Sequence, residues 1–186
     1  MLIKDGNLPE DTIQKTEILM NSARWLSITV AFLFVVIPVE KIHAQSSDIL
    51  GPVTKEQILA NDRIYEIYIN RYKPDSASVD YLSAFPDSVT LMVFMGSWCR
   101  ESKKYIPGLM KTLELADSER ITAEYLGVDQ QKKIPQILLK EFEIKYIPTI
   151  VVLKGNKELG RIVEKPHQLI ETDLIQILDF GKEKNE

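Results

Sequence analysis

Cysteine is the scarcest reactive residue of this chain, because its 186 residues contain only Cys99. An internal disulfide, a C-x-x-C redox pair and a multi-cysteine zinc site each require at least two thiols, so the sequence excludes all three. Histidine is nearly as rare, with only His43 and His167, and this pair does not favour a metal site. Cysteine–histidine catalysis would depend on His167, far along the sequence from Cys99. We therefore expect neither a metal nor another cofactor.

Excess positive charge is also missing. The net charge is −4 and the isoelectric point is near 5.4, and Lys and Arg residues form no cluster. Binding to nucleic acid or to anionic lipid requires such a cluster, so we expect no nucleic-acid partner. A chain of this length, with 45% hydrophobic residues, can bury one good core. We expect one globular domain with additional segments.

Long apolar runs are absent except at residues 26–39, where 14 residues carry no charge. A membrane-spanning helix needs about 20 apolar residues, whereas a secretory signal needs about 7 to 15 behind a basic flank, here Arg24. We therefore expect residues 1–44 to be a signal-peptide region, cleaved after Ala44, and the protein to be exported to the periplasm or the extracellular space. The polar stretch before the run is long for a signal leader, which favours Met20 as the true start.

Two other interpretations of the apolar run remain open. Residues 25–40 would serve as an uncleaved membrane anchor or as a buried core helix, although Pro38 interrupts a helix there. No cysteine stands directly after the run, where residues 40–45 read E-K-I-H-A-Q, which excludes a lipoprotein anchor. After removal of the signal we expect no stable insertion into a membrane.

Residues 45–85 are expected to form a linker and an N-terminal helical extension. Residues 45–52 are rich in Ser, Gly, Asp and Pro and indicate a flexible segment with nothing to bury. Thr54 and Gln57 have the spacing of a capping box, and helical periodicity continues to about Tyr72, followed by a short helical turn over residues 76–84. Four tyrosines in this segment would line a groove for a partner or dock the helices onto the core; these are Tyr65, Tyr68, Tyr72 and Tyr81.

The remaining pattern predicts a βαβα unit followed by a ββα unit. Strands are expected at residues 88–95, 122–128, 149–153 and 159–163, and helices at 99–116, 135–143 and 168–180. Gly155-Asn156 has the signature of a hairpin turn. In the helix at 135–143 we expect Ile137, Leu138 and Phe142 to face inward. Alternating strands and helices call for a parallel pair, and the hairpin adds antiparallel strands to the same sheet.

A short motif lies between the first of these strands and its helix. Residues 94–102 read F-M-G-S-W-C-R-E-S, Pro107 follows inside the helix, and I-P-T occurs at residues 147–149. With Asp129 after the second strand and K-G-N-K-E-L-G-R across the hairpin, this pattern resembles the thioredoxin superfamily over residues 86–180. The resemblance implies an α/β, thioredoxin-like three-layer sandwich. We expect a mixed sheet of about four strands flanked by helices, with the helical segment before it. The domain would span residues 86–181, and residues 182–186 would be a charged tail.

The motif places Cys99 at the start of a helix. Unpaired backbone N–H groups and the positive end of the helix dipole favour the thiolate there, and thiolate is the nucleophile. The charge of Arg100 would assist, Glu101 would oppose, and Ser102 would donate a hydrogen bond to the sulfur from one helical turn on. Trp98 would shield the thiol or simply pack beside the turn.

In the family that the chain resembles, the proline of Ile147-Pro148 is cis and lies beside the reactive cysteine. The resemblance therefore implies that Ile147, Pro148 and Thr149 bind an extended substrate segment. An ordinary trans proline at the start of a strand is the alternative.

Two departures from the family pattern bear on function. Ser102 stands where a dithiol enzyme carries its resolving cysteine, and Val93 stands where thioredoxins carry a buried acidic residue. A serine cannot resolve a mixed disulfide, so turnover would need an external thiol. The W-C-x-x-S site indicates thiol–disulfide exchange or isomerisation through Cys99 in the cell envelope. The alternative is a non-catalytic module that binds an extended polypeptide in the same groove. Cluster binding, as in monothiol glutaredoxins, fits poorly because their glycine-rich loop is absent.

Overall fold

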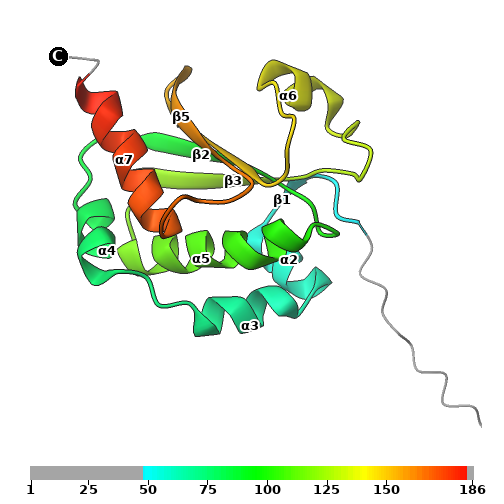
Figure 1. The fold of residues 1–186 in the computed structure, drawn as a ribbon, viewed down its shortest axis with the longest axis horizontal. Coiled ribbons are helices and arrows are strands. Elements are labelled where there is room, and N and C mark those ends of the chain that lie inside the picture. The colour runs from blue at the N-terminus through cyan, green and yellow to red at the C-terminus, as the bar shows by residue number, and fades with distance from the viewer. Residues whose placement is uncertain (1–47, 184–186) are drawn as a thin grey trace, which may run out of the picture. The chain divides into compact units, whose positions relative to one another are not determined.

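The computed structural model describes residues 48–183. The expected signal-peptide region, the choice between Met1 and Met20, and the end of the charged tail lie outside the described residues. Along the chain (Figure 1), the elements are β1 (Gly51–Val53), α2 (Lys55–Asn61), α3 (Ile64–Arg71), α4 (Ser76–Ser83), β2 (Val89–Met95), α5 (Arg100–Ala116), β3 (Ile121–Gly127), α6 (Gln136–Glu141), β4 (Thr149–Lys154), β5 (Lys157–Val163) and α7 (Ile170–Glu183). Every strand and helix expected after residue 85 is present.

The strands form one mixed sheet in the order β1-β3-β2-β4-β5. β2 and β3 are parallel, and the other neighbouring pairs are antiparallel. The parallel pair is joined through α5, as a parallel connection requires. The β4–β5 hairpin turns at Gly155, whose φ of +58° suits glycine. The α/β class and the hairpin are therefore confirmed.

The fifth strand, β1, was not expected. Gly51 lies opposite Gly127 and Val53 opposite Tyr125, so residues 51–53 extend the sheet beyond β3. The four expected strands are all present and β1 is a fifth, so the expected flexibility is wrong for residues 51 and 52. Three residues that include glycine and proline carry almost no strand signal of their own. The exposed edge of β3 supplies the partner that makes them a strand.

Both faces of the sheet are covered, which gives three layers. Alternate residues of β2 point to opposite faces: Leu91, Val93 and Met95 join a core with α3, α4, α5 and α7, while Met92 and Phe94 join a second core with α6. Figure 1 shows α5 below the sheet, α3 outside α5, and α6 above. No helix within residues 48–183 combines the length and apolarity needed to cross a bilayer.

The single helix expected up to Tyr72 is two helices. Its start is confirmed: Thr54 Oγ1 accepts the N–H of Gln57 at 3.2 Å, and Gln57 Oε1 accepts the N–H of Thr54 at 2.9 Å. Asp62 then leaves the helical conformation, with φ −149°. Its Oδ1 accepts the N–H of Ile64 at 2.9 Å, which starts α3. A short polar side chain that bonds to the backbone competes with helix continuation, and the apolar periodicity across it hid the break.

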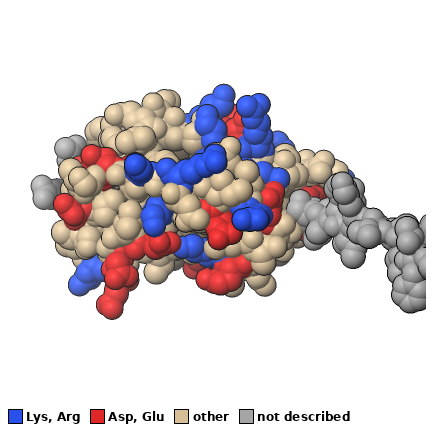
Figure 2. Space-filling model, turned by 90° about the horizontal axis from the view of Figure 1, so that it is seen from below, with Lys and Arg blue, Asp and Glu red and all other residues tan. Residues whose placement is uncertain are grey.

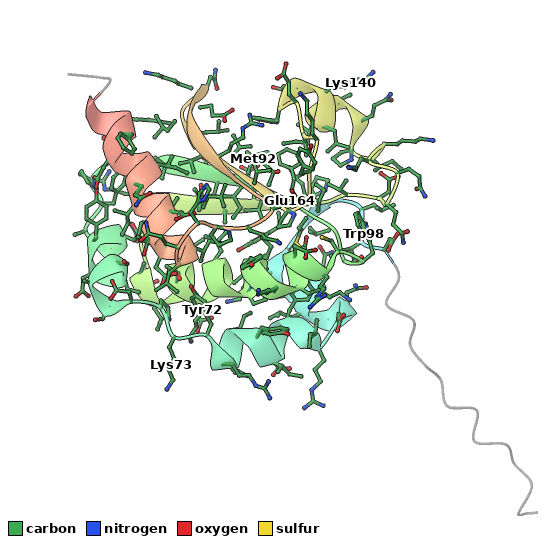
Figure 3. All side chains as sticks on the ribbon, viewed as in Figure 1. Tyr72, Lys73, Met92, Trp98, Lys140 and Glu164 are labelled. Atoms are coloured by element: carbon green, nitrogen blue, oxygen red, sulfur yellow. The ribbon has the colours of Figure 1, made fainter. Side chains whose placement is uncertain are left out.

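The tyrosines of the extension hold helices together. Tyr65 is buried in the core, Tyr72 Oη donates to Glu171 Oε2 at 2.6 Å (Figure 3), and Tyr81 donates to Asp179. Burial and the acceptor carboxylate of Glu171 raise the pKa of Tyr72 above the ordinary value of a tyrosine. Tyr68 keeps 39% of its surface exposed. These contacts favour docking of the extension over a partner groove.

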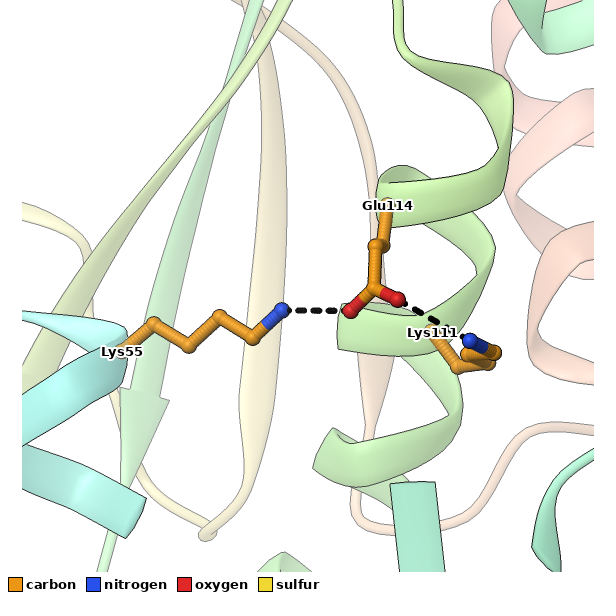
Figure 4. A network of polar contacts seen from close by, with 3 residues as sticks. All are labelled: Lys55, Lys111 and Glu114. Atoms are coloured by element: carbon orange, nitrogen blue, oxygen red, sulfur yellow. Dashed lines mark hydrogen bonds and ion pairs between the residues drawn. The ribbon is translucent and has the colours of Figure 1, made fainter. Parts of the chain in front are cut away.

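An ion-pair network ties α2 to α5 at the surface. Glu114 accepts from Lys55 Nζ at 2.8 Å and from Lys111 Nζ at 2.9 Å (Figure 4). The hydrogen bonds from Lys55 and Lys111 lower the pKa of Glu114 to about 2. Acidic and basic side chains are interspersed on the face shown in Figure 2. Exposed pairs of this kind add little stability, so the cores must supply most of it.

One residue of α6 faces the opposite way from its expected orientation. Ile137 is 80% exposed, and Leu139 takes the buried position instead. Residues two positions apart point to nearly opposite sides of a helix. In a helix of only six residues, the sequence pattern is too short to show which of them is buried. An apolar side chain is thereby left on the surface near the end of β3.

Candidate functional site

Cys99 closes the loop between β2 and α5 and is the N-cap residue of α5. Its backbone is extended, with φ −81° and ψ 124°, and its carbonyl accepts the N–H of Lys103 at 3.1 Å. The sulfur therefore lies where the helix presents its unpaired N–H groups and the positive end of its dipole. The side chain is 6% exposed. The position is the one that the motif predicts.

The Ile147–Pro148 segment lies directly beside the thiol. Cys99 Sγ donates to the carbonyl oxygen of Ile147 at 3.3 Å, and the Ile147–Pro148 peptide bond is cis. The sheet register explains the proximity, because Phe94 near the end of β2 lies opposite Thr149 at the start of β4. Thr149 Oγ1 donates to the carbonyl of Tyr146 at 2.8 Å and holds this turn. Cys99 and Ile147, 48 positions apart in sequence, thus meet where β2 ends and β4 begins.

Trp98 fastens the cysteine loop to the end of β3. Its Nε1 donates to the carbonyl of Val128 at 2.8 Å, and Figure 3 shows Trp98 beside the chain that leaves the sheet there. The indole also covers Gly96, where an added Cβ would lie 2.7 Å from Trp98 Cε2. Glycine is therefore required for the ring to approach the backbone this closely. Both contacts favour the packing interpretation of Trp98.

The structure corrects the expected hydrogen bond from Ser102 to the sulfur. Ser102 is fully buried, and its Oγ accepts the backbone N–H of Gly96 at 3.1 Å. A buried backbone donor at the end of a strand requires a partner, and the serine hydroxyl provides one. Ser102 thus holds the loop in shape, while the sulfur bonds to Ile147.

The charges around the thiol are unequal. Glu101 Oε2 lies 3.9 Å from Cys99 Sγ, at the limit for a weak S–H donor. Arg100 is exposed to solvent and forms no ion pair with residues 48–183. The charged side chain in contact with the sulfur is therefore the acidic Glu101, not the basic Arg100.

Asp129 shapes the loop that follows β3, a role that the sequence did not reveal. Its Oδ1 accepts the N–H groups of Lys133 and Ile134, both at 2.7 Å. Burial raises the pKa of Asp129, but the backbone donors lower it more, so its pKa lies below the ordinary value. The Ile134–Pro135 bond is also cis. An aspartate ahead of a lysine-rich, proline-containing turn is the signal that could have indicated this loop.

Replacing Asp129 by asparagine is expected to lower the melting temperature by a few degrees at pH 7, because the two N–H groups lose their charged acceptor. A carboxyl whose pKa is lowered on folding stabilises the folded state above its unfolded pKa of about 3.9, and this contribution is lost as the pH falls through the folded pKa. The difference from the unmodified protein should therefore close below about pH 4. Thermal unfolding followed by circular dichroism across this range measures it. Asp80→Asn, at an exposed position of α4, is the control and should leave the melting temperature unchanged across this range.

The described residues contain no group of three or more His, Cys, Asp and Glu side chains able to hold a metal ion. His167 lines a cleft of about 310 Å³ with Arg161 and Phe180, between β5 and α7. The hydrogen bonds of Cys99 Sγ go to Glu101 and Ile147, and neither residue lines this cleft. Cysteine–histidine catalysis through His167 thus finds no support in this geometry.

No family model and no curated protein matches the sequence. Three solved structures with partial likeness are thioredoxins. They are the germline-specific Deadhead of Drosophila melanogaster (17% identity, 54% of this chain and 87% of that one, TM-score 0.37), thioredoxin f2 of Chlamydomonas reinhardtii (19%, 58% and 93%, 0.38) and mitochondrial thioredoxin 3 of Saccharomyces cerevisiae (20%, 60% and 98%, 0.36). The mixed sheet with a parallel β2–β3 pair, a β4–β5 hairpin and helices on both faces has a thioredoxin-like fold.

Proposed function

We propose that this protein performs thiol–disulfide exchange in the cell envelope through Cys99, which forms mixed disulfides with cysteine-containing polypeptides. The observation that carries the proposal is the 3.3 Å contact between Cys99 Sγ and the carbonyl of Ile147 at the mouth of α5. A substrate sulfur that approaches Cys99 would lie beside the turn at residues 146–149, in which Tyr146 is exposed and the next three residues are buried. Location in the envelope rests on the apolar run at residues 26–39.

The exchange requires two displacements. In the first, the Cys99 thiolate attacks one sulfur of a substrate disulfide, the new S–S bond forms, and the second substrate sulfur leaves as a thiolate. In the second, an external thiol in its thiolate form attacks the mixed disulfide and releases Cys99 as a thiolate. Both steps conserve electrons, because one disulfide is broken for each one formed. No cofactor is required, and the external thiol replaces the resolving cysteine that Ser102 cannot supply.

Burial of the sulfur favours a second function, a non-catalytic module that binds an extended polypeptide. Cys99 is 6% exposed, its proton is donated to Ile147, and Glu101 lies close by. Little of the sulfur is therefore accessible to a disulfide that would react with it. The surface around the end of β2 and the start of β4 would then bind an extended polypeptide without covalent chemistry.

Reaction with an activated peptide disulfide distinguishes the two functions. Because the chain has one cysteine, any adduct on the full-length protein reports Cys99 alone. We expect one peptide per chain by mass spectrometry, release of that peptide by added thiol, and no adduct for Cys99→Ala. The rate should be at least about tenfold higher than that of the same chain unfolded in guanidinium at the same pH, since the fold activates a reactive thiol. A slower reaction in the folded state would favour the binding module.

A further inference from the structure

The loop after β3 presents a basic and aromatic surface beside the candidate site. Lys132, Lys133, Lys145 and Tyr146, here called the basic rim, are all exposed. Lys132 Nζ donates to the carbonyl of Lys145 at 2.8 Å and lies 5.9 Å from the centre of the Tyr146 ring. Tyr146 directly precedes Ile147, the partner of the thiol. The rim is thus one residue away from the sulfur's own contact.

Among residues 48–183, the acidic side chains near the rim form no ion pair with its lysines. The Asp129 carboxylate accepts two backbone N–H groups of its own loop. Glu141 and Glu143 line a cleft with Arg161 on the side of the β4–β5 hairpin. Within residues 48–183, no ion pair neutralises a lysine of the rim. Its positive charge is therefore available to a partner, on a chain whose net charge is −4.

The apolar part of this surface is also exposed. Tyr146 has 54% of its surface exposed and Ile134 47%. Ile134 lies next to Lys133 and is held by the carboxylate of Asp129 through its N–H group. Glu101, on α5, lies 3.9 Å from the sulfur. The surroundings of the thiol therefore include a basic and apolar rim and one acidic side chain.

We infer that the basic rim selects the substrate: the protein acts on extended polypeptides that carry acidic residues, together with an apolar side chain, next to the reactive cysteine. This inference rests on the proposed exchange function and gives its substrate class. A carboxylate of the substrate would pair with Lys132, whose ammonium group is held in place by Lys145 and Tyr146. A substrate with basic flanks would meet repulsion at the rim and lose the pairing.

Three short peptides that differ only beside the cysteine test the inference. The flanking residues are Glu, Gln or Lys, and each cysteine carries the same aromatic thiol as leaving group. The full chain should react fastest with the Glu peptide, about three- to tenfold faster than with the Lys peptide, and high salt should reduce this ratio. Lys132→Gln should lower the ratio to near that at high salt, because the Glu peptide loses its pairing with the ammonium group. Lys140→Gln, an equal loss of charge on α6 outside the basic rim, is the matched control and should leave the ratio unchanged.

The outcomes separate the inference from the function on which it rests. Equal rates for the three peptides would overturn the inference and leave exchange intact. If no peptide reacts, the exchange function is contradicted, and binding of the same peptides with serine in place of cysteine then decides the inference. Tighter binding of the Glu peptide that Lys132→Gln removes would support it, and equal affinities would contradict it. A small anionic disulfide provides a further comparison. If Lys132→Gln slows its reaction as much as that of the Glu peptide, the rim attracts any anion and the assignment to a polypeptide is wrong.

Discussion

Replacement of Glu171 by alanine is expected to lower the free energy of unfolding by about 3 kcal/mol, because three donors would lose their shared acceptor. Glu171 lies in the first turn of α7 and is fully buried. Its carboxylate accepts from Tyr72 Oη at 2.6 Å, from the Asp75 N–H at 2.9 Å and from Thr112 Oγ1 at 3.5 Å. It therefore joins the N-terminal extension and α5 to α7. A loss of this size should lower the melting temperature by about 10 °C, measured by calorimetry.

A double-mutant cycle identifies the cause of that loss. Tyr72→Phe should destabilise the unmodified protein by about 1 kcal/mol, because it removes one hydrogen bond. In the Glu171→Ala background the same change should be neutral or stabilising, because the tyrosine hydroxyl no longer has its partner. Glu141→Ala on exposed α6 is the control and should change stability by less than about 0.5 kcal/mol. Additive effects of Tyr72→Phe and Glu171→Ala would show that the carboxylate does not act through this hydrogen bond.

Replacement of Gly127 by alanine is expected to detach β1 from the sheet. A Cβ at this position would lie 2.1 Å from the carbonyl oxygen of Ile49, which is backbone and cannot turn aside. Overpacking of this kind costs about 1–3 kcal/mol. The Ile49 N–H donates to Ser97 Oγ at 3.2 Å in the cysteine loop. Hydrogen exchange at Ile49 should therefore become at least about tenfold faster, measured by NMR, together with a loss of thermal stability.

Gly160→Ala provides the matched control for this effect. Gly160 lies in β5, and an added Cβ there would meet the side chain of Ile177 at 2.9 Å. A side chain can change its rotamer, so the cost should be smaller. Exchange at Ile49, on the far edge of the sheet, should stay unchanged. Normal protection of Ile49 in Gly127→Ala would mean that β1 tolerates the methyl group and that the edge is looser than this packing implies.

The accuracy with which the sequence predicted each helix or strand depends on the length of that element. β2 and α5 were predicted nearly to the residue. A seven-residue apolar run rich in β-formers marks β2, and an apolar face repeated over seventeen residues marks α5. β1 and α6 were missed or misoriented, because three and six residues cannot establish a period. The break at Asp62 was missed for another reason: the apolar pattern continues across it, and only the side-chain bond to the Ile64 N–H ends the helix.

The candidate site shows the same division. The position of Cys99 at the mouth of α5 follows from the motif alone, whereas the partner of Ser102 does not. From the sequence, Ser102 lies one turn from the thiol and could bond to it. In the fold the hydroxyl of Ser102 accepts the buried N–H of Gly96, a backbone donor that needs an acceptor.

The sequence by itself determined the alternation of strands and helices, the single thiol at a helix start and the absence of any second thiol to resolve its bond. These are local or compositional properties, so one chain segment or one residue count contains them. Only the tertiary structure decided which distant groups meet: Ile147 with Cys99, Glu171 with Tyr72, and β1 with β3. Such pairs depend on the register of the sheet and on competition among buried donors and acceptors, which no single segment encodes.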